Sequence, residues 1–430
     1  MAFLRSLFAG VSGLRNHQTM MDVIGNNIAN VNTVAFKFGR TSFSELYAQT
    51  LRGAGRPMDN TGGTNPMQVG LGMSINTLDT VFSQGSIETT TNLTDLAIQG
   101  SGFFVVNKGG KQLFTRAGRF DLDQNGRLVN PGSGAILQGK MADATGQIPS
   151  GTSLEDIRIN RDVTSPAKAT TFVKFAGNLD ASAAVYSPGP PPTGGVVNSS
   201  VPVFDSLGNQ IALTLQFTKT GPNAWNWSAS IPDPLAPATP VNVGSGSVTF
   251  NTDGTLQSLS GSPISITPTS GAGPMTVALD FGTATATAPG IFSGLTQSAN
   301  SSAVTAREQD GYTAGLLSNI SIGAGGEILG TFTNGNMQTL AQIMLAEFNN
   351  PGGLMRTGDN AYDLSGNSGT AAIITPGETS TVVSYALEQS NVDLADEFTK
   401  MITAQRGFQA SARVITTSDE FLLEVVNLKR

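Results

Sequence analysis

Residues 4–37 read LRSLFAGVSGLRNHQTMMDVIGNNIANVNTVAFK. Apolar side chains recur here at alternating steps of three and four residues, which is the heptad spacing of a helix that packs along one stripe. The stripe comprises Leu7, Val11, Leu14, Met21 and Ile28. No proline occurs before Pro57, so the predicted helix can run without interruption into a group of asparagines. These are Asn26, Asn27, Asn30 and Asn32, and we expect the helix to end among them because asparagine caps backbone groups and tolerates left-handed backbone.

The C-terminal segment repeats this spacing and predicts a second helix. Its stripe comprises Leu394, Phe398, Met401, Phe408, Ile415 and Leu422. Either Ser390 or Asn391 is expected to cap its start. The two helices contain four glycines, and each costs roughly 1 kcal/mol relative to alanine; these are Gly10, Gly13, Gly25 and Gly407. We therefore expect both helices to depend on packing with each other, with other subunits, or both.

Between the helices, the sequence predicts β structure with tight turns. In the segments 73–165 and 305–384, short apolar runs flank Asn125-Gly126 and Asn334-Gly335, and such pairs favour hairpin turns. In the segment 166–304, strict alternation of apolar and polar residues predicts a hairpin with one buried face, which carries both tryptophans, Trp225 and Trp227.

These patterns together predict a multidomain α+β chain. A chain of 430 residues suggests two to four domains. We assign residues 1–32 and 385–430 to a terminal helical core of paired coiled-coil helices, and 33–72 to an extended connector. The segments 73–165 and 305–384 form an inner β domain made of two chain segments. Residues 166–304 form an outer β domain inserted into it.

Composition argues against several classes of function. The net charge is −7 with no basic cluster, so neither nucleic acid nor an anionic membrane is an expected partner. The chain has no cysteine, which excludes disulfides and thiolate metal sites. Arg5 and Arg15 interrupt the apolar N-terminus, so we expect no cleaved signal peptide.

The residues offer no catalytic, cofactor or metal site, and we do not expect an enzyme. His17 is the single histidine and is expected to be an ordinary helix-face residue. Asp121, Asp123 and Asn125 resemble the first half of a calcium loop, but Gly132 stands where such a loop needs a glutamate. We interpret this stretch as a hairpin turn. Paired acids for glycoside hydrolysis are invisible to sequence, so a hydrolase stays a weaker alternative.

Four motifs now carry a resemblance to the flagellar basal-body rod and hook axial proteins. They are DVIGNNIANVNTVAFK at 22–37, DLAIQGSGFFVV at 95–106, FTRAGRFDLDQNGRLV at 114–129, and VDLADEFTKMITAQRGFQASARVITTSDEFLLEVVNL at 392–428. They cover the outer thirds of the chain, and the middle matches weakly. The large insertion between the inner β segments resembles the hook subunits of this family, with a distal rod or other hook–basal body protein as the alternative. Some hook proteins crosslink through a cysteine, and this cysteine-free chain lacks that chemistry.

The resemblance implies a structural subunit that polymerises with itself into a flexible curved tube and transmits torque from rod to filament. It implies further partners: the hook cap protein, the distal rod protein, the hook–filament junction proteins and the flagellar type III export apparatus. The expected location is extracellular, after passage through the type III channel. The subunit interface is expected to use both helix stripes together with Asn26, Asn27 and Asn30.

An alternative from another class is a secreted β-rich adhesin or glycan-binding protein that binds through the middle domain. Such a site needs exposed aromatic side chains, and the candidates are Trp225 and Trp227. Their position in the alternating pattern predicts burial instead.

Overall fold

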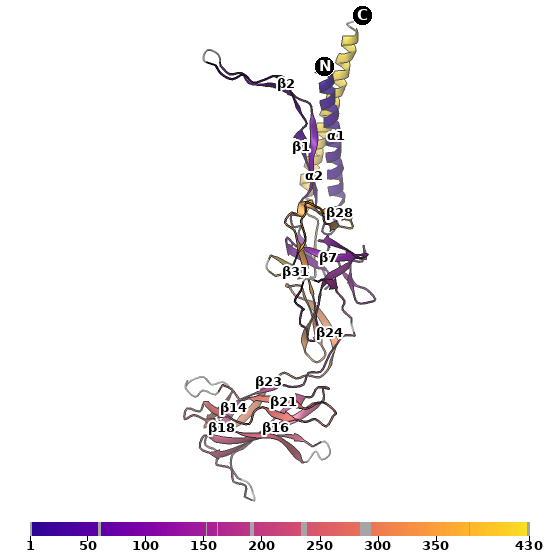
Figure 1. The fold of residues 1–430 in the computed structure, drawn as a ribbon. Helices are drawn as coiled ribbons and strands as arrows, with labels where there is room; N and C mark the ends of the chain where they lie inside the picture. Colours follow the sequence, from indigo (N-terminus) through magenta and orange to yellow (C-terminus); the bar gives the residue numbers. More distant parts are fainter. Residues whose placement is uncertain are drawn as a thin grey trace. The chain divides into compact units, whose positions relative to one another are not determined.

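The computed structural model describes residues 2–58, 62–151, 153–160, 162–189, 193–233, 239–283, 294–377 and 379–427. The chain divides into two compact units (Figure 1). Unit 1 comprises Met1–Asn160, Ser321–Leu329 and Thr339–Arg430, and unit 2 comprises Arg161–Ile320 and Gly330–Gln338. The division falls within strands β24 (Gly315–Ile322), β25 (Glu327–Phe332) and β26 (Met337–Ile343).

Among its described residues, unit 1 contains two α-helices, α1 (Ala2–Ala29) and α2 (Leu394–Asn427), and the short 3-10 helix η1 (Pro351–Gly353). Helix α1 ends among the asparagines as expected, and the Asn30 side chain donates to the Asn26 carbonyl at 2.9 Å. The predicted cap of α2 was wrong. Asp393 caps this helix by accepting the backbone N–H groups of Ala395 at 2.8 Å and Asp396 at 3.3 Å. Its carboxylate sits directly before the first turn, whereas Ser390 and Asn391 lie too far upstream to reach those groups.

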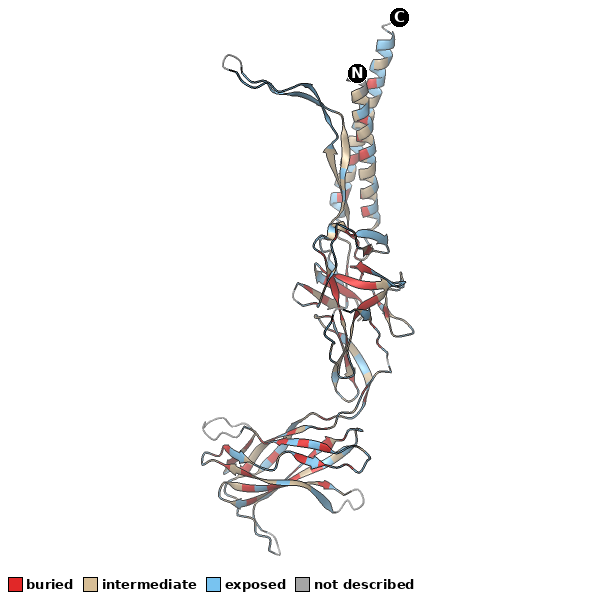
Figure 2. Ribbon diagram, viewed as in Figure 1, coloured by how far each residue is buried: buried red, intermediate tan, exposed pale blue. Residues whose placement is uncertain are grey.

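Two antiparallel hairpins follow α1; strands β1 to β3 lie in the segment 33–72 expected to be an extended connector, and β4 lies directly after it. Strand β1 (Gly39–Glu45) pairs with β4 (Met73–Thr80). Between them, β2 (Ala48–Arg52) pairs with β3 (Met67–Gly70). The β1–β4 hairpin is largely half-buried, whereas every residue of β2 and β3 is exposed (Figure 2).

The β body of unit 1 combines strands from both sides of the middle region. Strand β5 (Ile87–Thr89) pairs with β32 (Ala386–Glu388). Strand β6 (Leu96–Gly100) pairs with β31 (Ser380–Ser384). Strand β7 (Phe103–Lys108) pairs with β27 (Leu345–Glu347). Further strands of this body are β8 (Lys111–Thr115), β9 (Asp121–Leu122), β10 (Leu128–Val129), β11 (Ile136–Met141), β12 (Glu155–Asp156), β28 (Met355–Gly358), β29 (Ala361–Asp363) and β30 (Ala372–Ile374). Its core contains Phe103, Phe114, Phe348 and Tyr362, whose rings meet edge to face.

The suspected calcium loop is a hairpin turn, as interpreted from the sequence. Strands β9 and β10 pair across it, and Gly126 has a φ of +75°. The Asp123 carboxylate accepts the backbone N–H groups of Asn125 and Arg127 at 2.9 and 2.7 Å. This carboxylate is therefore engaged in shaping the turn.

In the part of unit 2 that the structure describes, two five-stranded sheets pack as a sandwich. One sheet has the order β15 (Val196–Phe204), β16 (Gln210–Gly221), β17 (Ala224–Pro232), β18 (Pro240–Phe250) and β19 (Leu256–Leu259). The second sheet has the order β20 (Ile264–Ile266), β21 (Met275–Asp280), β14 (Phe172–Asp180) and β22 (Leu295–Ser298). Strand β23 (Ala303–Gln309) pairs with β14 as well. Strand β13 (Thr164–Ser165) pairs with β24.

The predicted hairpin of the middle region is confirmed. Phe217 of β16 lies opposite Trp227 of β17, and both tryptophans are buried between the sheets. Phe281 contacts this cluster from the second sheet, with its ring centre 5.6 Å from that of Phe217 and 6.0 Å from that of Trp227. Alternation thus placed one apolar face of each strand in a common core.

Among the described residues, no helix is sufficiently long and apolar to cross a membrane.

Candidate functional site

Helices α1 and α2 lie side by side along much of their length, with both chain ends at the same end of the pair (Figure 1). The side-chain contacts and close approaches follow a regular order. Along α1 they join Ser6 to Ser418, Gly10 to Ile415, Gly13 to Ser411, His17 to Gly407, and Asn27 to Glu397. Residue numbers rise along α1 as they fall along α2, so the helices are antiparallel.

Small residues let the two helices approach closely. A Cβ atom added at Gly13 would lie 2.6 Å from Ser411 Oγ, and one at Gly407 would lie 2.5 Å from the His17 ring. Neither separation is compatible with a real side chain without displacement. The glycines that weaken each helix therefore make room for its partner. By contrast, Gly25 has nothing within 4 Å of such an atom.

The contact line differs from the apolar stripes predicted from the sequence. In α1, contacts occur at Ser6, Gly10, Gly13 and Asn27, each one residue before a predicted stripe position. One residue corresponds to about 100° around a helix of 3.6 residues per turn. The intramolecular seam is thus small and polar, and the apolar stripe lies beside it.

The structure places the predicted interface residues in three environments. Exposed are Val11, Asn26, Leu394 and Phe398. Half-buried are Leu7, Leu14, Met21, Ile28, Asn30, Met401, Phe408, Ile415 and Leu422. Only Asn27 is fully buried, and of the apolar set Ile415 faces Gly10 across the seam.

Asn27 joins three elements at the base of the helix pair. Its Nδ2 donates to the Gly39 carbonyl at 2.8 Å and to Glu397 Oε2 at 2.9 Å. Its Oδ1 accepts the Gly39 backbone N–H at 2.9 Å. Because Gly39 begins β1 and Glu397 lies in the first turn of α2, this one side chain fixes where α1, β1 and α2 meet.

His17 is a helix-face residue, as predicted. Its ring lies against Gly407 and meets the Phe43 ring edge to face at 6.1 Å between centres. Its Nδ1 is buried and has no hydrogen-bond partner among the described residues. The described residues also contain no group of three or more His, Asp or Glu side chains that could hold a metal.

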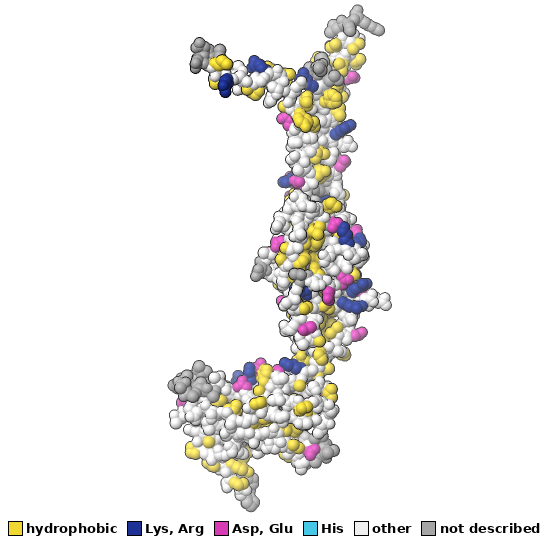
Figure 3. Space-filling model, in the orientation of Figure 1, with side chains coloured by type: hydrophobic (Ala, Val, Ile, Leu, Met, Phe, Trp, Pro, Cys, Tyr) yellow, Lys and Arg dark blue, Asp and Glu magenta, His cyan; other side chains and the backbone are white. Residues whose placement is uncertain are grey.

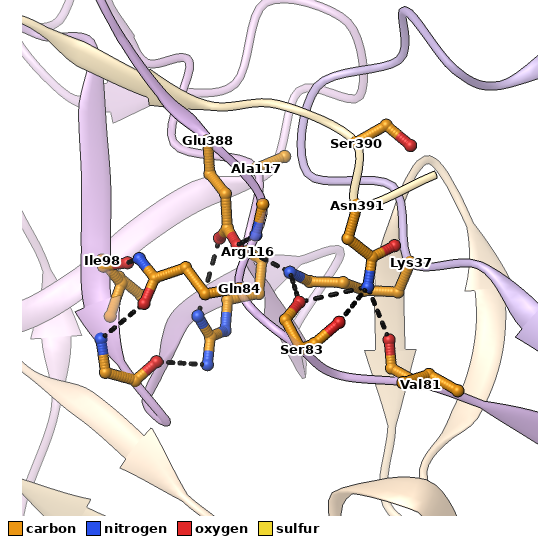
Figure 4. Close-up of polar contacts among 12 residues, drawn as sticks. Lys37, Val81, Ser83, Gln84, Ile98, Arg116, Ala117, Glu388, Ser390 and Asn391 are labelled. Atoms are coloured by element: carbon orange, nitrogen blue, oxygen red, sulfur yellow. Dashed lines mark hydrogen bonds and ion pairs between the residues drawn. The ribbon is translucent and has the colours of Figure 1, made fainter. Parts of the chain in front are cut away.

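Below the helices, Lys37, Arg116 and Glu388 form a buried charged junction (Figure 4). Lys37 Nζ lies 2.6 Å from Glu388 Oε1, and Arg116 Nη1 lies 3.5 Å from Glu388 Oε2. Lys37 Nζ also donates to the Ser83 carbonyl at 2.7 Å, and Glu388 Oε1 accepts the Gly85 N–H at 2.9 Å. Two buried cations therefore share a single buried carboxylate.

Burial lowers the pKa of Lys37, and the charge of Glu388 opposes this effect. Burial likewise lowers the pKa of Arg116, again opposed by Glu388. The Arg116 guanidinium also donates to the Gly100 carbonyl at 2.8 Å and lies 5.0 Å from the centre of the Phe103 ring. Buried charges are tolerated where such partners replace water.

Asn391 adds a second connection beside the junction (Figure 4). Its Nδ2 donates to the Val81 carbonyl at 2.9 Å and to the Ser83 carbonyl at 3.1 Å, while its Oδ1 accepts the Phe38 N–H at 2.9 Å. This residue was expected to cap α2 and instead ties the segment before α2 to the segment after α1.

Sequence reasoning missed both the small-residue seam and the junction. A signal for the seam existed, because glycine and serine recur at heptad spacing at Ser6, Gly10 and Gly13 and at Gly407, Ser411 and Ser418. No local signal marked the junction, since its three residues lie in distant parts of the chain.

Models of four domain families match successive parts of this chain. Residues 7–37 match "Flagella basal body rod protein" and residues 97–171 match "Flagellar hook protein FlgE/F/G D1 domain". Residues 178–312 match "Flagellar basal body protein FlaE D2 domain", and residues 383–428 match "Flagellar basal body rod FlgEFG protein C-terminal".

Relatives matched over nearly their whole length are flagellar hook and basal-body rod proteins. The chain is 42% identical to flagellar hook protein FlgE of Borreliella burgdorferi, over 99% of this chain and 100% of the relative. It is 34% identical to flagellar hook protein FlgE of Escherichia coli, over 97% and 98%. Flagellar basal-body rod protein FlgG of Bacillus subtilis is 29% identical over 99% and 100%.

A solved structure has a related fold. The crystal structure of flagellar hook protein FlgE2 from Helicobacter pylori matches with a TM-score of 0.53 at 16% identity, covering 70% of this chain and 100% of that one.

Proposed function

The chain belongs to the flagellar hook protein family, and from this premise we propose that it polymerises through its terminal helices into a curved, flexible tube. This tube joins the rotating rod to the filament and transmits torque between them. The 42% identity to a hook protein over 99% of the chain carries the proposal. The role is structural and requires no catalysis.

The helix pair supports polymerisation because its seam leaves apolar side chains uncovered. Val11, Leu394 and Phe398 are 40%, 40% and 50% exposed. Apolar side chains grouped along a helix surface are typical of protein interfaces. We propose that α1 and α2 form a coiled-coil unit, and that their predicted stripes contact neighbouring copies. A contact between two different surfaces of identical subunits builds a helical polymer when its rotation does not close into a ring.

The proposed domains assign distinct tasks to the chain. The helical core (1–32 and 385–430) lines the tube, and the connector (33–72) leads to the inner β domain (73–165 and 305–384). The inserted outer domain (166–304) makes weak polar contacts that slide as the hook rotates. Its richness in Ser, Thr, Gly and Asn suits such contacts, because strong ion pairs would lock one register.

The remaining partners follow from the hook position. We propose contacts with the distal rod protein at one end, with the hook–filament junction proteins at the other, and with the hook cap protein during assembly. We propose that the chain reaches the exterior unfolded, through the flagellar type III export apparatus.

A basal-body rod protein is the second candidate, favoured by the 29% identity to FlgG over 99% of the chain. The alternative of an adhesin or glycan-binding protein needs exposed aromatic side chains, but its two candidates, Trp225 and Trp227, are buried.

Electron microscopy of the purified full-length chain under polymerising conditions tests the proposal. We expect curved tubes, and straight tubes would favour the rod instead. A chain that stays monomeric at every concentration and salt condition would contradict both. A variant lacking residues 166–304 should form tubes that no longer supercoil normally.

A further inference from the structure

The turn between β9 and β10 holds an Asn-Gly pair whose asparagine side chain is free. The Asp123 N–H donates to the Arg127 carbonyl at 2.9 Å, and the Gly126 N–H donates to the Asp123 carbonyl at 3.0 Å. Asn125 is exposed and is held through its backbone, because its N–H donates to the Asp123 carboxylate and its carbonyl accepts Arg158 Nε. Within the described part of the chain, its side-chain amide has no hydrogen-bond partner.

The turn between β25 and β26 repeats this backbone around the other Asn-Gly pair. The Phe332 N–H donates to the Asn336 carbonyl and the Gly335 N–H to the Phe332 carbonyl, both at 2.9 Å. The φ of Gly335 is +79°, close to the +75° of the first turn. Here, however, Asn334 Nδ2 donates to the Thr313 carbonyl at 2.7 Å, and its Oδ1 accepts the Asn336 N–H at 3.0 Å. The two turns thus match in backbone and differ in the freedom of the asparagine side chain.

Asparagine is chemically labile, and glycine after it favours loss of the side-chain amide without an enzyme. The backbone nitrogen of the glycine attacks the side-chain carbonyl carbon. A C–N bond forms, and the amide leaves as ammonia with the proton of that nitrogen, which gives a cyclic succinimide. Water then adds to either ring carbonyl and opens the ring to aspartate or isoaspartate. The side chain must rotate into position for this attack, so its freedom controls the rate.

We propose that Asn125 is a site of spontaneous deamidation in this protein and that the fold protects Asn334. In both turns the attacking N–H must leave the same backbone bond, so this cost cancels in the comparison. The Asn334 side chain must in addition break two hydrogen bonds before it can rotate. Deamidation should therefore be roughly tenfold slower at Asn334 than at Asn125.

Isoaspartate at this site would alter the segment through which the chain leaves unit 1. The Gly126 carbonyl accepts the Ile159 N–H at 2.6 Å, and Gly126 lies so close that an added Cβ would be 2.5 Å from the Ile159 carbonyl oxygen. The next residue, Asn160, is the last of the first segment of unit 1. Isoaspartate inserts one more carbon into the main chain between Asn125 and Gly126. This insertion displaces Gly126 and weakens its hold on Ile159.

Aspartate, the other product, leaves the main chain unchanged and adds a negative charge. Acidic and basic side chains are mixed over the β body (Figure 3). At this turn, Arg158 Nε lies 3.0 Å from the Asn125 carbonyl oxygen, and Arg127 pairs with Asp123 at 2.8 Å. The new carboxylate has these two cations nearby, so it should disturb the turn less than isoaspartate does.

Incubation of the folded full-length chain in mildly alkaline buffer tests the proposal, with each site followed by peptide mass spectrometry. We expect the mass gain of an amide-to-carboxyl exchange at Asn125, and roughly tenfold slower exchange at Asn334. The same chain in urea is the control, because unfolding frees both side chains and should bring the two rates together. Equal rates in the folded chain would overturn the proposal. A difference that persists in urea would also overturn it, because local sequence would then be the cause.

Two variants separate the products and need no assembly into tubes. Asn125→Gln should show no exchange at this site during the same incubation, and Asn125→Asp carries the aspartate product from the start. Urea unfolding followed by circular dichroism should find aged protein that contains isoaspartate less stable than fresh Asn125→Asp. An isoaspartyl methyltransferase assay measures the isoaspartate content. Aged protein as stable as Asn125→Asp would overturn the effect on Gly126 and Ile159.

Discussion

Lys37 and Glu388 are 351 residues apart in the chain, yet Lys37 Nζ and Glu388 Oε1 lie 2.6 Å apart with both side chains fully buried. Arg116 approaches the other oxygen of the same carboxylate. The segment after α1, the β body and the segment before α2 are thereby held at one point. We therefore expect force on either helix of a torque-transmitting polymer to reach the β body through this junction.

Glu388→Gln should destabilise unit 1 by about 3–5 kcal/mol, because it leaves two buried cations without their carboxylate. Lys37→Met should cost less, since Arg116 still pairs with Glu388. Urea unfolding followed by the helical circular dichroism signal measures both. Asp359→Asn, which removes an exposed pair with Lys108, is the control and should change stability little. A loss from Glu388→Gln no larger than that of the control would contradict the role of the junction.

The helix seam predicts opposite effects for two glycines of α1. Gly13→Val should lower stability by roughly 1–3 kcal/mol, because the new side chain meets Ser411. Gly25→Ala should raise it by up to about 1 kcal/mol, because helix propensity improves and the added atom meets nothing. Thermal unfolding of the monomer, monitored by helical circular dichroism, measures the difference. Equal effects at the two positions would show that α1 and α2 do not pack through this seam.

Acid should weaken unit 2 through Asp310. Burial raises the pKa of this carboxyl, but hydrogen bonds from Thr171, Phe172 and Lys168 outweigh burial and bring it to about 2. In the unfolded chain the pKa of this carboxyl is close to 3.8. Unfolding therefore takes up a proton when the pH lies between these two pKa values. The stabilisation, about 2 kcal/mol, is complete above pH 4 and is lost as the pH falls towards 2.

Tryptophan fluorescence during urea unfolding at several pH values measures this effect, because both tryptophans lie in unit 2. Asp310→Asn should be less stable at pH 6 and should flatten the pH dependence in this range. An unchanged slope in the variant would assign the acid sensitivity to other carboxylates.

The two buried tryptophans should respond differently to replacement by phenylalanine. Trp227 Nε1 donates to the Ser260 carbonyl at 3.1 Å, whereas Trp225 Nε1 is buried with no hydrogen-bond partner among the described residues. Trp227→Phe therefore loses a hydrogen bond as well as volume, and should cost about 1 kcal/mol more than Trp225→Phe. Urea unfolding followed by the fluorescence of the remaining tryptophan compares the two. A larger loss from Trp225→Phe would contradict the assignment.

Local patterns in the sequence determined the elements of this fold. Heptad spacing predicted α1 and α2, Asn125-Gly126 predicted its turn, and alternation predicted the hairpin that buries Trp225 and Trp227. Each of these signals depends on residues within a few positions of one another, because helix and strand periods are properties of the local backbone. The long motifs at both ends indicated the family for the same reason.

Tertiary structure alone decided which faces meet. Apolar spacing pointed to the stripe of Leu7, Val11 and Leu14, but α1 meets α2 one residue earlier, where Gly10 and Gly13 permit close approach. Asn391 does not cap α2 but binds Val81 and Ser83 beside the junction, because the fold brings these residues, some 310 positions away, next to it. Lys37 and Glu388 are likewise far apart in the chain and meet only in the folded protein. Close approach and buried charge pairing depend on atoms that only the folded chain brings together, so no local period encodes them.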